Sequence, residues 1–271
     1  MKNLIKYNIE ILSFLFFIII QILIISLYLS SLTFILIYIF LANLVILLSL
    51  IDGTKKFKIY VKDIDIKKTD KTIYFYNQII IPLSLFISTE IFLIINRFNI
   101  TISEIIMLIS LVLFYTSLRY IESYFEVFEF SEKAHYTINT VKLFIFFLSI
   151  YTLFEISTII NMSLIIEIIF VFLISFSLIL MMMQRNKKYN IKYIAYSFLF
   201  SLIIIFISTL SLLYLKNALL TAFLLSLIFY IFENIVHHKI HKNLSNEIII
   251  EYILIALIMF LIARGIFLIY V

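Results

Sequence analysis

Nine apolar stretches of about 20 residues each, the length that crosses a bilayer, make up most of this 271-residue chain. Hydrophobic residues account for 64% of the chain and charged residues for only 14%, whereas soluble domains carry about 25% charged residues. Backbone groups in lipid must be satisfied within the protein, and an α-helix does this inside one segment. The sequence therefore predicts an all-α, polytopic integral membrane helix bundle and excludes a soluble globular fold.

We expect a single transmembrane domain over residues 1–271 with about nine membrane helices. Their approximate ranges are 11–29, 31–51, 79–96, 102–118, 141–161, 163–183, 193–215, 217–235 and 248–270. An odd number of spans places the two termini on opposite sides of the membrane.

The basic residues fix the orientation of these spans, because Lys and Arg accumulate in cytoplasmic loops. With nine spans, 18 of the 21 basic residues fall on the side of the N-terminus, and only Arg97, Lys216 and Arg264 fall elsewhere. This distribution predicts a cytoplasmic N-terminus and an outside C-terminus in the cell membrane. The net charge of +5 then marks cytoplasmic loops, so we expect the lipid bilayer and not nucleic acid as a partner.

The composition also excludes several chemistries. The chain contains no Cys and only two Gly. It therefore has no disulfide, thiolate nucleophile or Cys-ligated metal, and it cannot form a glycine-rich phosphate loop.

The long loop after the second span carries alternating acids and lysines. Asp63 and Asp65 are followed by Lys67 and Lys68. Paired carboxylates can hold Mg²⁺, which in turn holds a diphosphate, and lysines add charge for the same anion. The alternative is a solvated basic loop that lies against lipid headgroups.

A second basic loop follows the sixth span and has the sequence Asn186-Lys187-Lys188-Tyr189-Asn190-Ile191-Lys192. Together with the Asp65 loop and the Tyr115 to Arg119 step, it resembles the UbiA-type intramembrane prenyltransferases. That family has nine helices, a cytoplasmic N-terminus, and Asp-rich motifs after helices two and six.

The resemblance implies an isoprenyl diphosphate bound with Mg²⁺ at the cytoplasmic face, and prenyl (alkyl) transfer if the protein is active. The implied binding residues are Asp63, Asp65, Lys67, Lys68, Asn186, Lys187, Lys188, Lys192 and Arg119. Val61, Lys58 and Met182 stand where the family has aspartates, and Phe57 stands where it has an asparagine. Because these motif residues are missing, one alternative is a diverged member of the family that has lost catalysis.

Glu90, Glu104, Glu155 and Glu167 lie inside predicted spans, and Glu251 lies nearer the cytosolic end of its span. An ionisable group in the bilayer is costly and usually faces a partner or a cavity. Pairing with Arg97 or Arg264 would form a structural clamp. A vestibule lined by acids would instead indicate an ion- or proton-coupled transporter or permease subunit. Glu90 lies deepest and has no obvious partner.

Glu233, His237 and His241 are spaced four residues apart, so they share one helical face. Imidazoles one turn apart can bind a metal ion, and the alternative is a pH-responsive basic cap on the eighth span. A third class of function, a non-enzymatic membrane partner protein, also fits the sequence.

Overall fold

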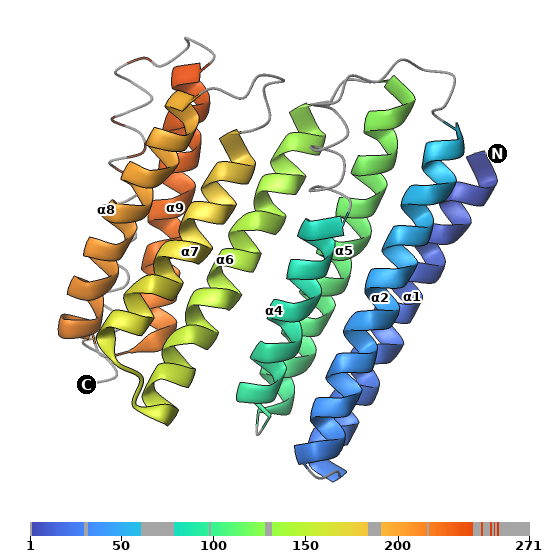
Figure 1. Ribbon diagram of the computed structural model, residues 1–271, viewed down its shortest axis with the longest axis horizontal. Coiled ribbons are helices and arrows are strands. Elements are labelled where there is room, and N and C mark those ends of the chain that lie inside the picture. Colours follow the sequence, from blue (N-terminus) through green and yellow to red (C-terminus); the bar gives the residue numbers. More distant parts are fainter. Residues whose placement is uncertain are drawn as a thin grey trace. The chain divides into compact units, whose positions relative to one another are not determined.

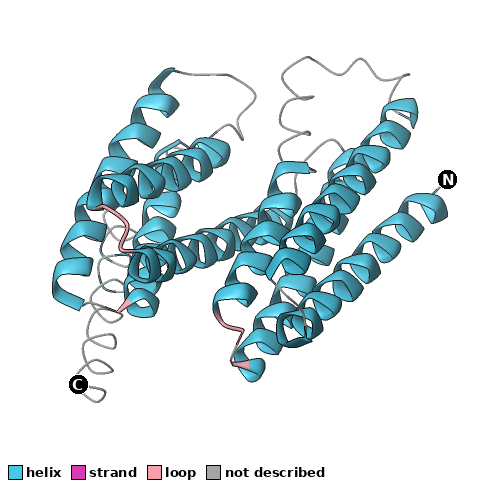
Figure 2. Cartoon of the chain, turned by 60° about the horizontal axis from the view of Figure 1, so that its bottom comes forward, coloured by secondary structure: helices cyan, strands magenta, loops and turns pink. Residues whose placement is uncertain are grey.

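The computed structural model describes residues 2–29, 32–60, 79–97, 99–127, 132–183, 191–215 and 217–240, together with residues 245, 250, 252 and 254. Helices joined by short loops make up this described part, and it contains no strand (Figure 2). The all-α prediction is confirmed for these residues.

Eight helices are labelled in Figure 1. They are α1 (Lys2–Leu29), α2 (Leu32–Tyr60), α4 (Ile81–Ile95), α5 (Ile100–Val127), α6 (Glu132–Ile160), α7 (Leu164–Met183), α8 (Ile191–Leu215) and α9 (Ala218–Ile240). The first eight predicted spans each fall on one of these helices. The ninth, 248–270, lies almost entirely outside the described residues.

Four stretches of the described residues are long and apolar enough to cross a membrane: Ile100–Arg119, Thr137–Ile160, Ile194–Ser211 and Ala218–Ile235. Shorter apolar stretches of 10–17 residues occur in the other four helices: Ile9–Ile25, Ile37–Ile51, Ile81–Ile95 and Leu164–Leu180. These stretches support a helical, multi-pass membrane protein.

Several helices continue beyond their apolar stretches. The predicted spans 31–51, 102–118 and 141–161 cover only part of three helices, because α2 runs to Tyr60, α5 runs to Val127 and α6 begins at Glu132. Hydropathy marks only the part of a helix that lies in hydrocarbon, and backbone hydrogen bonds can continue past it. The predicted spans are therefore shorter than the helices at these ends.

Asparagine side chains and backbone shape the short connections between helices. Asn99 Oδ1 accepts a hydrogen bond from the Ile102 N–H (3.2 Å), and Asn217 Oδ1 accepts one from the Leu220 N–H (3.0 Å). Both residues satisfy backbone donors that the first turn of a helix leaves unpaired. Asn161 has a φ of 50°, a left-handed conformation that Asn adopts more readily than most residues. It ends α6 just before α7.

The chain divides into two compact units, Met1–Ile145 and Phe146–Val271, and the boundary falls inside α6. In the first unit, α4 contacts α1, α2 and α5, and α1 also contacts α2 and α5. The rings of three buried phenylalanines join three of these helices. Phe16 of α1 stacks on Phe114 of α5 (centroids 4.7 Å apart) and meets Phe86 of α4 edge-on (5.4 Å).

In the second unit, α8 contacts both α7 and α9. Four buried serines, Ser197, Ser201, Ser208 and Ser211, follow one face of α8, and small side chains of this kind allow membrane helices to approach closely. Phe172 of α7 meets Phe198 of α8 edge-on, with centroids 5.6 Å apart. These contacts explain why the second unit is compact.

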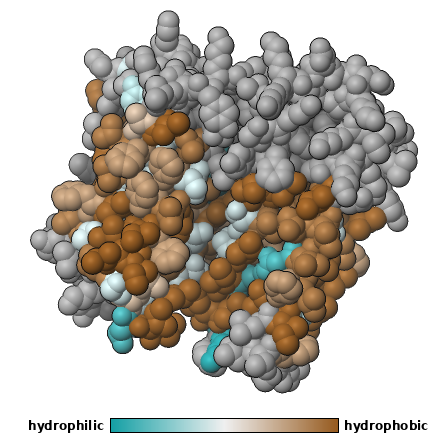
Figure 3. Space-filling view, in the orientation of Figure 1, coloured by the Kyte–Doolittle hydropathy of each residue, from teal (hydrophilic) through white to brown (hydrophobic). Residues whose placement is uncertain are grey.

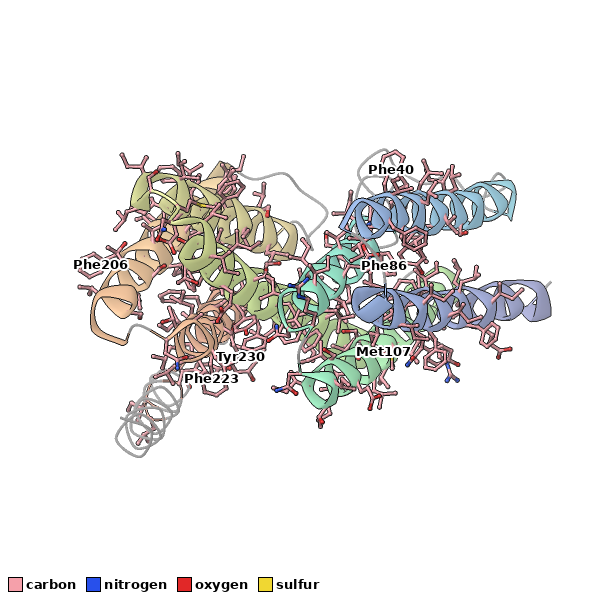
Figure 4. All side chains as sticks on the ribbon, turned by 90° about the horizontal axis from the view of Figure 1, so that it is seen from below. Phe40, Phe86, Met107, Phe206, Phe223 and Tyr230 are labelled. Carbon is pink, nitrogen blue, oxygen red and sulfur yellow. The ribbon has the colours of Figure 1, made fainter. Side chains whose placement is uncertain are left out.

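Large apolar side chains are exposed along most of the described helices, and the described part of the face in Figure 3 is mostly brown. Phe40 of α2 and Phe206 of α8 point away from their helices (Figure 4), with exposed fractions of 67% and 65%. A soluble protein rarely exposes contiguous apolar surface of this kind. Lipid chains are the solvent in which such a surface is stable.

Candidate functional site

Three consecutive polar residues, Ser88, Thr89 and Glu90, lie in the middle of α4 and are all buried. Pro82, the only proline of the chain, stands in the first turn of this helix, where a missing N–H costs nothing. Because α4 contacts α1, α2 and α5, its polar residues are enclosed by other helices. Glu90 is only 1% exposed.

Asn43 of α2 is the hydrogen-bond partner of Glu90. Its Nδ2 donates one hydrogen bond to Glu90 Oε2 (2.5 Å) and a second to the backbone oxygen of Ile39 (2.9 Å). Both hydrogens of the amide nitrogen are therefore used. In the sequence, Glu90 is the deepest acid and has no obvious partner, and the structure supplies one from a different helix.

Two atoms of this Asn43–Glu90 pair are left without a partner. Glu90 Oε1 and Asn43 Oδ1 are buried and make no hydrogen bond among the described residues. Leaving a buried polar group unpaired costs about 1–3 kcal/mol, and more if it is charged. The pair therefore still needs a hydrogen-bond donor or a cation for these two oxygen atoms.

The neighbouring hydroxyl groups are already engaged. Ser88 Oγ donates to the Leu85 oxygen (3.1 Å), and Thr89 Oγ1 lies within hydrogen-bond distance of the same oxygen (2.7 Å) and of Ser110 Oγ on α5 (2.9 Å). The Tyr38 hydroxyl donates to the backbone oxygen of Ile19 on α1 (2.6 Å). These hydroxyl groups stabilise the helices and their contacts, and none of them donates a hydrogen bond to the unpaired oxygens of the Asn43–Glu90 pair.

The other three predicted intramembrane acids have different surroundings. Glu104 of α5 is exposed, Glu155 of α6 is half-buried, and Glu167 of α7 is buried. The Ser157 side chain near the end of α6 lies beside the Glu167 carboxyl group at the start of α7. Both residues belong to one helical hairpin, and Arg264, one of the two arginines considered as partners, lies outside the described residues.

Glu90 and Glu104 belong to the same unit but are not joined. Ser110 marks the level of Thr89 on α5, and Glu104 lies six residues away, about 9 Å along the helix axis. Among the described side chains of the first unit, Glu90 is hydrogen-bonded to Asn43, whereas the Glu104 side chain is exposed. The buried acid of α4 is thus a site of its own.

Most of the predicted diphosphate-binding residues lie outside the described residues. These are Asp63, Asp65, Lys67, Lys68, Asn186, Lys187 and Lys188. Arg119 is exposed on α5, and Lys192 lies in the first turn of α8. The two motif loops follow α2 and α7, which belong to different units.

The candidate metal stripe begins at Glu233, which is half-buried on α9. His237 lies on the same helix, and His241 lies outside the described residues. Among the residues that the structure describes, no three His, Asp or Glu side chains are grouped so that they could hold a metal ion.

Lys142 is a buried residue among the 18 basic residues expected on the cytoplasmic side. It is 4% exposed and lies within the apolar stretch Thr137–Ile160 of α6. Lys142 lies just inside the predicted span 141–161, and this position could have indicated from the sequence that its side chain is buried.

No protein-family model, no curated protein and no solved structure matches this chain. The geometry of the Asn43–Glu90 pair and the sequences of the two motif loops are therefore the grounds for assigning a function.

We expect the Asn43–Glu90 pair to be strongly coupled. Asn43→Leu removes the donor to a buried carboxyl group and should lower the free energy of unfolding by about 1–3 kcal/mol. Glu90→Met should cost less, because Asn43 keeps its hydrogen bond to Ile39. The double variant should be close to wild type, since replacing both partners by apolar groups of similar shape can be nearly neutral.

Unfolding in mixed micelles titrated with sodium dodecyl sulfate measures these free energies. Glu10→Gln is the control, because Glu10 is exposed on α1 and its replacement should change stability by less than about 0.5 kcal/mol. Destabilisations that simply add in the double variant would show that the two side chains do not interact.

Proposed function

We propose that this chain is an ion- or proton-coupled membrane transporter, or a permease subunit of one, in which Glu90 carries the coupling charge. The observation that supports this proposal is the buried Glu90 carboxyl group, whose Oε1 has no hydrogen-bond partner among the described residues. Ionisable residues inside membrane helices are costly and mark ion pathways and proton relays.

The geometry suggests how such a carboxyl group would work. A carboxylate surrounded by apolar helices is unstable unless a cation neutralises it. Asn43 holds one carboxyl oxygen in place with a hydrogen bond, so the other oxygen is left to bind a proton or cation. Binding and release would change the charge in the middle of the first unit and so favour different arrangements of its helices.

We also propose nine spans, a cytoplasmic N-terminus and an outside C-terminus in the cell membrane. This topology places 18 of the 21 basic residues on the cytoplasmic side, as the positive-inside rule requires.

Single cysteines test the topology, because the chain contains no native cysteine. In intact cells, a membrane-impermeant maleimide should label Arg97→Cys and Asn161→Cys, both exposed in short connections between helices. Thr69→Cys and Asn190→Cys should be labelled only after permeabilisation. Labelling of Thr69→Cys in intact cells would contradict the orientation.

A pH jump tests the role of Glu90 without knowledge of the transported substrate. Proteoliposomes of the purified full chain, adsorbed on a solid-supported membrane, should give a transient current when protons bind within the bilayer. Glu90→Gln should reduce this current to that of protein-free liposomes, and Glu10→Gln should leave it unchanged. Equal currents from Glu90→Gln and wild type would refute the proposal.

A second candidate function is the binding of an isoprenyl diphosphate with Mg²⁺, as the UbiA-type resemblance implies. Its support is the order of the motifs in the sequence, because Asp63 and Asp65 follow the end of α2 at Tyr60, and Asn186 to Lys188 follow the end of α7 at Met183. An enzyme of this kind would use Asp63, Asp65 and the lysines of both loops to hold the diphosphate, and would transfer the prenyl group to an acceptor.

Binding of isoprenyl diphosphates of several chain lengths to the purified protein tests this second candidate. We expect binding that requires Mg²⁺ and is lost in the double variant Asp63→Asn/Asp65→Asn, while Asp70→Asn, in the same loop, retains it. Release of diphosphate would add evidence for transfer. If chelation of Mg²⁺ changes nothing, the candidate fails.

A further inference from the structure

The hydrogen bonds of the Asn43–Glu90 pair lack one donor. The amide nitrogen of Asn43 uses its two hydrogens on the Ile39 oxygen and on Glu90 Oε2. The remaining atoms, Asn43 Oδ1 and Glu90 Oε1, are both acceptors when Glu90 is ionised, and both are buried without a partner. Two acceptors cannot satisfy each other.

A single proton resolves this mismatch. A proton on Glu90 Oε1 makes that atom a donor, and Asn43 Oδ1 is the unpaired acceptor on the amide group that already binds the other carboxyl oxygen. The acid and the amide can then form two hydrogen bonds in one ring, and no polar atom of either side chain is left unpaired. We propose that the Asn43–Glu90 pair is a one-proton binding site in which Glu90 Oε1 carries the proton and Asn43 Oδ1 accepts its hydrogen bond.

A proton fits this site better than a metal ion does. A hard cation such as Ca²⁺ or Mg²⁺ takes about six or more oxygen ligands, including waters. The pair offers two unpaired oxygens, whereas the Ser88, Thr89 and Tyr38 hydroxyl groups are engaged with backbone oxygens or with Ser110. A proton needs only the two oxygens that are present.

The charged and titratable groups around the pair are few. On the described parts of the helices packed against α4, Tyr38 of α2 is close enough to interact electrostatically with Glu90. Glu10 of α1 and both Glu104 and Arg119 of α5 are exposed, and Tyr115 of α5 is half-buried. Among the described side chains, Asn43 is the hydrogen-bond partner of Glu90, and the proposal assigns the neutralising charge to a proton.

Release of the proton would weaken the contact between α2 and α4. The carboxylate would keep the Nδ2 hydrogen bond but would bring its second oxygen toward the partially negative Oδ1. Proton binding would thus control how tightly α2 and α4 are joined. This role in coupling rests on the function proposed above, whereas the existence of the proton site does not.

Infrared spectroscopy of the full chain in lipid bilayers tests the site directly, because a protonated carboxyl group absorbs at a higher frequency than a carboxylate or an amide. We expect an acid band at neutral pH that Glu90→Gln removes and Glu10→Gln leaves in place. In Asn43→Leu the band should move to a still higher frequency, because the acid loses both of its hydrogen bonds to the amide group. The exchanged variant Asn43→Asp/Glu90→Gln should recover a hydrogen-bonded acid band, since it restores one acid and one amide.

Absence of the acid band in the wild type, or its loss on addition of Na⁺, would overturn the proton site in favour of an ionised carboxylate or a sodium site. A band unchanged by Asn43→Leu would also overturn it, because the amide would then not accept the proton. If the band behaves as expected but the pH-jump current is absent, the proton site stands and the transport proposal fails.

Discussion

The absence of water from the hydrocarbon core of a bilayer is the constraint on which this structure depends. Each polar group that enters the core must find its partner inside the protein. Backbone groups do so by forming helices, and hydroxyl groups such as Ser175 and Ser226 donate to the carbonyl oxygen of the preceding turn. A carboxylate cannot donate a hydrogen bond to the carbonyl oxygens of its own helix, so Glu90 requires a partner from another helix. Asn43 meets half of that requirement, and a proton or cation is left to meet the rest.

The helices could be predicted from the sequence because hydropathy is a local property. The first eight predicted spans each fall on one helix, and Glu90 was identified because a charge is conspicuous in an apolar segment. Asn43 was missed because its role depends on contact between α2 and α4, which no pattern within one segment encodes. It is nevertheless the only amide side chain in the predicted span 31–51, and this was the available signal. The parts of α2 and α5 that extend beyond Ile51 and Leu118 were missed for a simpler reason. High hydropathy marks only the segment within hydrocarbon, whereas a helix can continue beyond it.

The two proposed functions use different parts of the chain. The transport proposal depends on a buried pair in the first unit, where every atom involved is described. The diphosphate proposal depends on two loops, one after α2 and one after α7, whose residues lie outside the described ranges. In the transport proposal, a proton or cation neutralises the single carboxyl group of Glu90. In the diphosphate proposal, Mg²⁺ and lysines neutralise a diphosphate at the membrane surface. The tests of the two proposals therefore do not overlap.

Solid-state NMR of the protein in lipid bilayers tests the central claim most directly. With ¹⁵N-labelled asparagine side chains and ¹³C-labelled glutamate, the account predicts a dipolar contact between Asn43 Nδ2 and the Glu90 carboxyl carbon. It also predicts that this carbon has the chemical shift of a carboxylic acid at neutral pH. A Glu90 carbon with the shift of a carboxylate, or without any contact to the Asn43 side chain, would contradict the account.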